Sequence, residues 1–156
     1  MNYLKILSKN EKAEIERQLN EQFGIKTIPG IIVKRNEERL FLFSGNLNEK
    51  DISQIEKCAF IERMGVYFAK LFDGKIRLSI EGSQILKDQI TKNIFELDDQ
   101  LAEEWMKGRE LPIKTGKHEF LIMKHGEDFL GTGKASEEKI GNFIPKNRRL
   151  REKNRS

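Results

Sequence analysis

Lysine and arginine side chains are concentrated near the C-terminus of this 156-residue chain. From Ile140 to Ser156 there are six of them against the single acid Glu152, a local charge of +5, whereas residues 1 to 139 sum to −1. A block of like charge is typical of a solvated interaction tail, and a polyanion is the commonest partner of a basic one. We interpret residues 153–156 as such a tail and expect an anion-binding surface just before it.

The segment from Asn142 to Arg151 interleaves apolar residues with cations, so its cations can be anchored. Pro145 lacks an N–H group and has a restricted backbone, so it ends the preceding strand and gives the following side chains a rigid base. The arginine guanidinium is a planar fork that matches phosphate or guanine edges, whereas lysine acts as a point charge. We therefore expect Arg148 and Arg149 to make the contacts that depend most on geometry.

Two glycines alternate in the sequence Phe129-Leu130-Gly131-Thr132-Gly133-Lys134. Without side chains at alternate positions, one face of a strand is open to close approach. Tight packing of the protein against itself is the favoured explanation for Gly131 and Gly133, and the approach of a nucleic-acid backbone is the alternative. Lys134 would present a cation from the same edge.

Patterns that support catalysis or metal binding are missing from the sequence. The chain has one cysteine, Cys58, and neither a Cys-x-x-Cys nor a His-x-x-x-His spacing. We expect Cys58 to be a small buried hydrophobic residue rather than a catalytic thiol. The segment 131–133 is too short for a phosphate-binding loop, and no dinucleotide-type glycine loop is present. The sequence therefore predicts no enzyme activity, no metal and no cofactor.

The longest apolar runs, such as Phe120–Met123, are far too short to cross a bilayer, and the start of the chain lacks an apolar signal-peptide core. We expect a cytoplasmic protein without a membrane partner.

The first half of the chain predicts a mixture of helices and strands. Ser8 and Glu11 have capping-box spacing, and the following helix carries an apolar stripe and ends at Gly24. Asp73-Gly74 is a strong type I′ hairpin signal. Strands are expected over 30–35, 39–44, 65–72 and 75–80, with a second helix capped by Asn48 that runs to about Cys58.

The second half predicts a small barrel after a boundary near residue 90. Asp98 can cap a helix that Gly108 ends, and Trp105 on that helix is expected in the core rather than as a base-stacking residue. The predicted strands cover 93–97, 119–124, 128–134 and 139–144, and short strands with glycine-rich turns favour a barrel.

Three motifs in this half resemble a known family. They are Trp105-Met106-Lys107-Gly108, Phe129 to Lys134, and Asn142-Phe143-Ile144-Pro145-Lys146 leading to Arg148-Arg149-Leu150-Arg151. Over roughly residues 93–151 the chain resembles the PUA domain, named for pseudouridine synthases and archaeosine transglycosylases, in the variant found at the C-terminus of Sun/Fmu-type rRNA cytosine methyltransferases. Residues 63–86 extend the likeness to stand-alone archaeal ribosome-biogenesis proteins, in which a small α+β domain precedes the PUA domain.

This resemblance implies an α+β fold with a small N-terminal mixed α/β domain at residues 1–90, a PUA-like pseudo-barrel at 91–151 and a basic tail at 152–156. It also implies RNA binding in ribosome biogenesis or rRNA maturation, without catalysis. Ribosomal RNA is the expected partner and tRNA a second candidate. The predicted RNA-binding residues are Lys117, Lys124, Lys134, Lys146, Arg148, Arg149 and Arg151.

A different function remains open on the sequence alone. The chain could be a protein-binding adaptor, with a ribosome-assembly protein as partner, or a targeting subunit that acts in trans for a separate RNA-modifying enzyme. In that case the less charged first domain would carry the essential contact.

Overall fold

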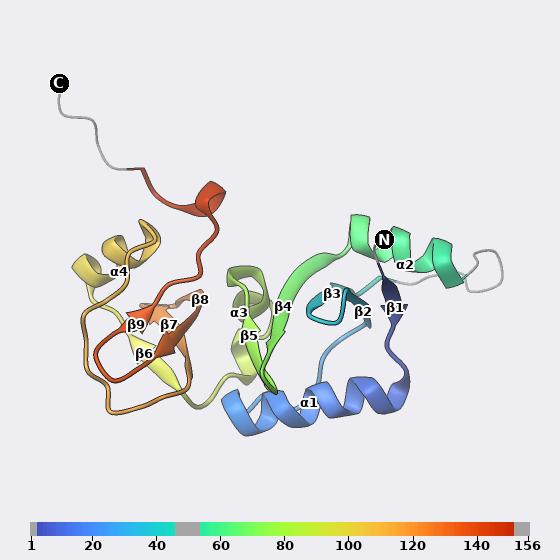
Figure 1. The fold of residues 1–156 in the computed structure, drawn as a ribbon, viewed down its shortest axis with the longest axis horizontal. Coiled ribbons are helices and arrows are strands. Elements are labelled where there is room, and N and C mark those ends of the chain that lie inside the picture. The colour runs from blue at the N-terminus through green and yellow to red at the C-terminus, as the bar shows by residue number, and fades with distance from the viewer. Residues whose placement is uncertain (1–2, 46–53, 152–156) are drawn as a thin grey trace.

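The computed structural model describes residues 3–45 and 54–151, and in this part of the chain the fold is α+β with two sheets. Sheet A is formed by the N-terminal half and sheet B by the C-terminal half, and the short helix α3 (Ile80–Ile85) lies between them (Figure 1). The predicted fold class is confirmed.

Sheet A has five antiparallel strands in chain order: β1 (Leu4–Ile6), β2 (Ile31–Arg35), β3 (Arg39–Phe43), β4 (Val66–Phe72) and β5 (Lys75–Leu78). Two tight hairpins set its order. Asp73 and Gly74 have φ values of +48° and +76°, and Asn36 and Glu37 have +53° and +71°. Positive φ at both central residues defines type I′ geometry, so the hairpin predicted at 73–74 is confirmed.

Helix α1 (Lys9–Phe23) packs on one face of sheet A. The capping box forms as predicted, since Ser8 Oγ accepts from the Glu11 N–H and the Glu11 carboxylate accepts from the Ser8 N–H. Leu19 and Phe23 are fully buried against strand residues of sheet A, and Gly24 ends the helix with φ +82°.

Helix α2 (Gln54–Met64) packs on the other face, against β1, β2 and β3. It continues six residues beyond the predicted end at Cys58, and the proposed cap Asn48 lies outside the described residues. Cys58 is buried with Val33 and Ile61, as predicted, and burial raises the pKa of its thiol.

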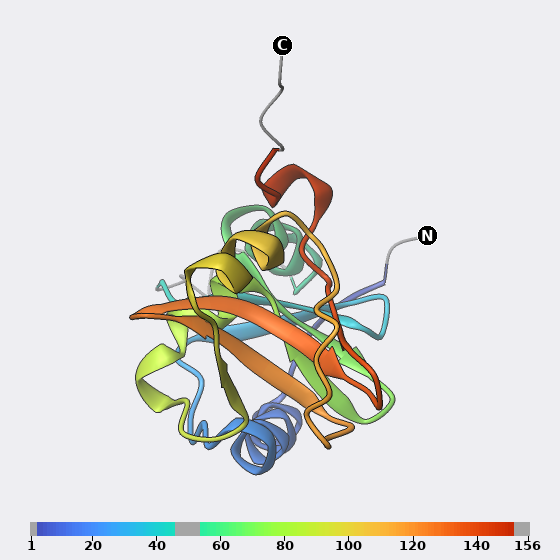
Figure 2. The same cartoon turned by 90° about the vertical axis from the view of Figure 1, so that its left-hand side faces the viewer.

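Sheet B has four strands, β6 (Ile94–Glu96), β7 (Phe120–His125), β8 (Asp128–Ala135) and β9 (Ile140–Gly141), which curl into a half-barrel (Figure 2). Strand β6 is parallel to β7, and the other pairs are antiparallel. The strand predicted over 139–144 is wrong in length: only Ile140–Gly141 pair with β8, because the backbone from Asn142 onward bonds to side chains and leads into Pro145.

Helix α4 (Asp99–Met106) covers the half-barrel and is capped by Asp98, which accepts from the Leu101 N–H at 2.8 Å. Trp105 is fully buried and donates its indole N–H to the Leu130 carbonyl at 2.9 Å. The prediction that Trp105 belongs to the core is confirmed.

The two sheets share one apolar cluster. Phe120, Ile122 and Phe129 of sheet B belong to the same buried cluster as Leu19 and Phe23 of α1. The predicted boundary near residue 90 falls in the connection between the 3₁₀ helix η1 (Lys87–Gln89) and β6, and the division into two domains stays a prediction. No described helix has the length and apolar character needed to cross a membrane.

Candidate nucleic-acid interface

An exposed aromatic ring, Phe143, lies where the two sheets meet. Its ring is 38% exposed, the guanidinium carbon Cζ of Arg77 from sheet A lies 4.2 Å from its centroid, and its edge contacts Phe120 of sheet B at 6.2 Å between centroids. A guanidinium at this distance over a ring is held by a cation–π interaction. Phe143 therefore joins a cation of sheet A to the C-terminal segment.

One of the predicted cations, Lys134, lies beside this ring system. Lys134 Nζ is 5.4 Å from the centroid of Phe120 and donates to the His118 carbonyl at 2.6 Å. Lys117, next to His118 in the chain, is exposed and lies 4.0 Å from Glu119. We use the name Phe143 surface for Phe143, Arg77 and Lys134 together with two exposed lysines, Lys117 next to His118 and Lys146 three residues after Phe143 in the chain.

Lys124 lies elsewhere. It pairs across the ladder with Phe129, beside the β7–β8 hairpin turn, whereas Lys134 pairs with Phe120 at the opposite end. Lys124 follows Phe120 by four positions along the strand, roughly 14 Å of backbone. Lys124 Nζ is 3.8 Å from Glu96, so the structure does not bring this predicted residue to the Phe143 surface.

The segment after β9 is held by one asparagine. The side-chain amide of Asn142 donates to the carbonyls of Trp105 at 2.8 Å and Arg109 at 2.9 Å, and its oxygen accepts from the Ile144 N–H at 2.8 Å. Pro145 then leads into the 3₁₀ helix η2 (Lys146–Arg148). Asn142 thus fixes the backbone that carries Phe143 and the following cations to the end of α4.

Arg149 does not project from this segment as predicted. Its Nε donates to the Ile144 carbonyl at 2.9 Å, and its side chain lies against Gly108, where a Cβ would be 2.3 Å from Nε. Gly108 has φ +86° and therefore serves both the end of α4 and the packing of Arg149. Arg149 anchors the C-terminal segment, and its role in RNA contact stays a prediction.

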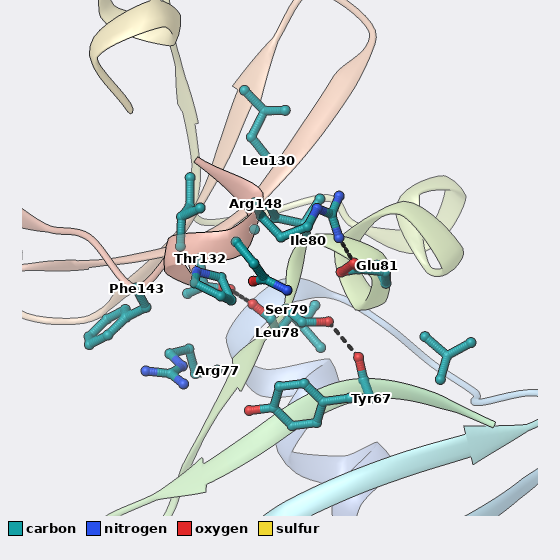
Figure 3. A pocket seen from close by; sticks show the side chains of 15 residues that line it. Tyr67, Arg77, Leu78, Ser79, Ile80, Glu81, Leu130, Thr132, Phe143 and Arg148 are labelled. Atoms are coloured by element: carbon teal, nitrogen blue, oxygen red, sulfur yellow. Dashed lines mark hydrogen bonds and ion pairs between the residues drawn. The ribbon is translucent and has the colours of Figure 1, made fainter. Parts of the chain in front are cut away.

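Arg148 points toward a cleft between the sheets and forms an ion pair with Glu81 of α3 (Figure 3). The cleft has a volume of about 280 Å³, and its lining includes Tyr67, Arg77, Phe143 and Asn147. Lys146 is exposed and forms no ion pair with any described residue, and Arg151, the last described residue, is exposed. Of these predicted cations, Arg148 lines the cleft, and Lys146 lies in the chain between two lining residues, Pro145 and Asn147.

The two alternating glycines are packing residues. A Cβ at Gly133 would be 2.6 Å from Ile140 Cγ2 and 2.9 Å from the ring of Trp105, and Gly131, with φ +81°, lies against Ile80 of α3. The favoured explanation, packing of the protein against itself, is confirmed.

Sequence reasoning missed Arg77 and Glu81. The alternation Lys75-Ile76-Arg77-Leu78 could have placed Arg77 on the outer face of a strand, but its neighbour Phe143 is 66 residues away and no local signal links the two. Among the described residues, no group of three His, Cys, Asp or Glu side chains is placed to hold a metal ion.

Comparison with known proteins shows what the second half of the chain is similar to. Residues 92–150 match the family described as the methyltransferase RsmF PUA domain, which covers sheet B, α4 and the segment that carries Phe143. This match is consistent with the PUA-like domain that the sequence motifs predicted over roughly residues 93–151.

Two relatives extend the similarity into sheet A. The chain is 28% identical over 142 residues to the ribosomal RNA small subunit methyltransferase F of Aeromonas salmonicida and 30% identical over 146 residues to that of Vibrio campbellii. The matches cover 90% and 89% of this chain but only 28% and 29% of the relatives, so the chain spans less than a third of their length. Both relatives are bacterial, and the predicted likeness to archaeal proteins stays a prediction.

Proposed function

We propose that this chain is a non-catalytic RNA-binding protein that acts in ribosomal RNA maturation and holds RNA at the Phe143 surface. The observation that carries the proposal is the placement of two cations over two touching rings. Arg77 lies over Phe143 and Lys134 lies over Phe120. Phe120 is buried and supports the exposed ring of Phe143, so the two cations and the Phe143 ring offer contacts both to phosphates and to base faces.

The charges around this surface support a polyanionic partner. Arg77 forms no ion pair among the described residues, and Lys117 and Lys134 have no carboxylate within direct hydrogen-bond distance. Glu81 is the carboxylate at the cleft, and its charge is balanced by Arg148. The local field therefore stays positive where a phosphate would approach.

Ribosomal RNA is the proposed binding partner because the names of both relatives include it. Transfer RNA is the second candidate, since a surface of this kind contains nothing that distinguishes the two. We also propose a cytoplasmic location. The hydrogen bonds of the cleft support the non-catalytic part of the proposal. The hydroxyls of Ser79 and Thr132 donate to backbone carbonyls rather than to a base, and the carboxylate of Glu81 is ion-paired.

The test is the affinity for small-subunit rRNA fragments and for tRNA, measured by fluorescence anisotropy at several salt concentrations. The variant Lys134→Gln, Lys146→Gln removes two charges from the Phe143 surface. The matched control Lys124→Gln, Lys87→Gln removes one half-buried lysine that also lies over a ring, at 5.6 Å from Phe129, and one exposed lysine of the connection.

We expect the first variant to weaken binding about tenfold or more and to reduce the slope of log affinity against log salt by roughly 1.4 to 1.8, because each phosphate contact contributes about 0.7 to 0.9. The control should bind like the wild type. Absence of RNA binding by the wild type would refute the proposed function. Equal weakening in both variants would refute the Phe143 surface, because Lys124 lies at the other end of the ladder.

The alternative function is a protein-binding adaptor or a targeting subunit for a separate RNA-modifying enzyme. The observation that favours it is an exposed apolar group where α2 leads into β4: Phe60, Met64 and Val66 are 37%, 59% and 36% exposed. In this alternative a protein partner would bind the first half of the chain. Its affinity would not change when the charges of Lys134 and Lys146 are removed.

A further inference from the structure

Four cations lie in one row across sheet A. The strand register places Arg35 opposite Arg39, Arg39 opposite Lys70, and Lys70 opposite Arg77. Directly paired residues point to the same face of a sheet, and neighbouring strands are about 4.8 Å apart, so the four side chains form a line across β2, β3, β4 and β5. We call this line the cation row.

The cation row lies on the face opposite to α1. The chain neighbours Leu40, Ala69 and Leu78 are almost completely buried in the cluster that contains α1, so the alternate residues Arg39, Lys70 and Arg77 point away from it. Helix α2 packs over β1, β2 and β3 on this side. Arg39 is exposed, and Lys70 and Arg77 are half-buried.

Such a row works against the stability of the sheet, because like charges directly opposite one another repel. Two nearby carboxylates form only long ion pairs with cations of the row. Glu62 lies 3.8 Å from Arg35 and Glu38 lies 3.8 Å from Lys70, both beyond hydrogen-bond distance. Arg39 and Arg77 form no ion pair within residues 3–45 and 54–151. The row thus holds excess positive charge on one face.

Both unpaired guanidiniums lie over aromatic rings. Arg39 Cζ is 5.5 Å from the centroid of Tyr67, and Tyr67 in turn contacts Phe41 at 5.6 Å. In the same way, the guanidinium carbon Cζ of Arg77 lies over the ring of Phe143. Figure 3 shows Tyr67, Arg77 and Phe143 around the same opening. A guanidinium supported by a ring presents a planar, charged surface on which an unpaired base can stack.

We propose that the cation row and Tyr67 form a second RNA-contact surface that binds a single-stranded segment next to the RNA held at the Phe143 surface. The inference rests on the proposed function and extends the RNA-binding surface onto sheet A. Phosphates of the single strand lie on the cation row, and its unpaired bases stack on the ring-supported guanidiniums. Arg77 belongs to both surfaces and makes them continuous.

Single-stranded RNA fits this face better than a duplex or an acidic protein. In a duplex the base faces are stacked on one another and cannot reach the rings, whereas an unpaired strand exposes both phosphates and bases. An acidic peptide would match the charges of the row but would make no use of the planar guanidiniums over Tyr67 and Phe143.

The test compares an rRNA hairpin with a blunt end and the same hairpin with an unpaired 3′ or 5′ extension. The variant Arg39→Gln, Lys70→Gln removes two charges of the row without touching the Phe143 surface. The matched control Lys9→Gln, Lys26→Gln removes two exposed charges at the ends of α1, on the other side of sheet A. Thermal unfolding of each variant verifies the fold.

We expect the extension to tighten binding about tenfold in the wild type and in the control, and the row variant to lose most of this gain. Its salt slope for the extended RNA should fall by roughly 1.4, or about 0.7 for each lost contact to a single strand. Its affinity for the blunt hairpin should stay unchanged.

Two results would overturn the inference while leaving the proposed function intact. One is an extension that does not tighten binding of the wild type, or that tightens binding of the row variant equally. The other is tight binding of a polyglutamate peptide that carries the same charge as the extension. If the wild type binds this peptide as tightly as it binds the extended hairpin, and the row variant does not bind it, the row recognises charge alone. If the wild type binds neither the extended nor the blunt hairpin, the proposed function is refuted instead.

Discussion

Arg148, in the C-terminal segment, forms an ion pair with Glu81 on α3, the helix that lies between the two sheets. Both side chains are about 40% exposed at the mouth of the cleft. Exposed ion pairs contribute little to stability, about 0 to 1 kcal/mol, so this pair can open at low cost. A phosphate that approaches Arg148 must compete with the Glu81 carboxylate.

Replacement of Glu81 by glutamine should therefore tighten RNA binding. We expect a gain of about twofold to fivefold at low salt, because Arg148 becomes available and a negative charge leaves the cleft. The unfolding free energy should change by less than about 1 kcal/mol. Anisotropy titration against an rRNA fragment measures the gain, with Glu127→Gln in the distant β7–β8 turn as the control. Weaker binding of Glu81→Gln would mean that the ion pair positions Arg148 for RNA.

Replacement of Gly108 by alanine should destabilise the protein in two ways. A left-handed backbone costs a residue with a Cβ about 1–2 kcal/mol, and the new methyl group would displace Arg149 from the Ile144 carbonyl. Gly116→Ala is the matched control, because Gly116 has φ +76° and open space around it. Urea unfolding should show a larger loss for Gly108→Ala than for Gly116→Ala.

The Arg149→Ala background separates the two contributions. In that background Gly108→Ala should cost no more than Gly116→Ala does, because only the backbone strain remains. An undiminished difference would show that Arg149 is not the residue that makes position 108 intolerant of a side chain.

The start of α1 should make stability depend on pH. The hydrogen bond from Lys5, followed by those from Ser8, lowers the pKa of Glu11 from its usual 4.5 to about 2. A carboxyl group with a lower pKa in the folded state stabilises the fold above its ordinary pKa, and this stabilisation is lost as the pH falls toward the folded value. The window therefore runs from about pH 4.5 down to about pH 2.

The variant Glu11→Gln should lack this part of the pH dependence. Its melting temperature should lie below that of the wild type at neutral pH, and the difference should shrink across the window as Glu11 becomes protonated in the wild type. Melting curves followed by circular dichroism measure both. A difference that stays constant from neutral pH to pH 2 would contradict the role of the Glu11 charge.

Local signals were sufficient for many elements of this fold. The capping box of Ser8 and Glu11, the Asp73-Gly74 turn and the Asp98 cap each depend on residues within a few positions of one another, so their spacing in the sequence determines their geometry. The burial of Trp105 and Cys58 also followed from the apolar stripes of their helices.

The last strand and the second helix were predicted less well. A strand was expected over 139–144, but Asn142 bonds to the carbonyls of Trp105 and Arg109, more than 30 residues earlier, and only Ile140–Gly141 join the ladder. The pairing of β6 parallel to β7 depends on the whole path of the chain through α4 and was equally inaccessible to local patterns.

The candidate site illustrates the same division. The sequence by itself determined that the cations after Pro145 form a charged, anchored segment and that three motifs resemble a PUA domain, because charge, composition and motif are properties of neighbouring residues. Only the tertiary structure decided which cations act together. It turned Arg149 inward against Gly108, paired Arg148 with Glu81 and left Lys124 at the far end of its strand.

The same holds for the cation row of Arg35, Arg39, Lys70 and Arg77. These residues come from four strands, and nothing in their spacing shows that they lie side by side until the register of each strand pair is known. Strand register is set by the burial of Leu40, Ala69 and Leu78 against α1, and a shift of one residue would turn every one of these cations into the core. The chain therefore encodes the charges locally, whereas the cooperative packing of the core determines the surface that they form.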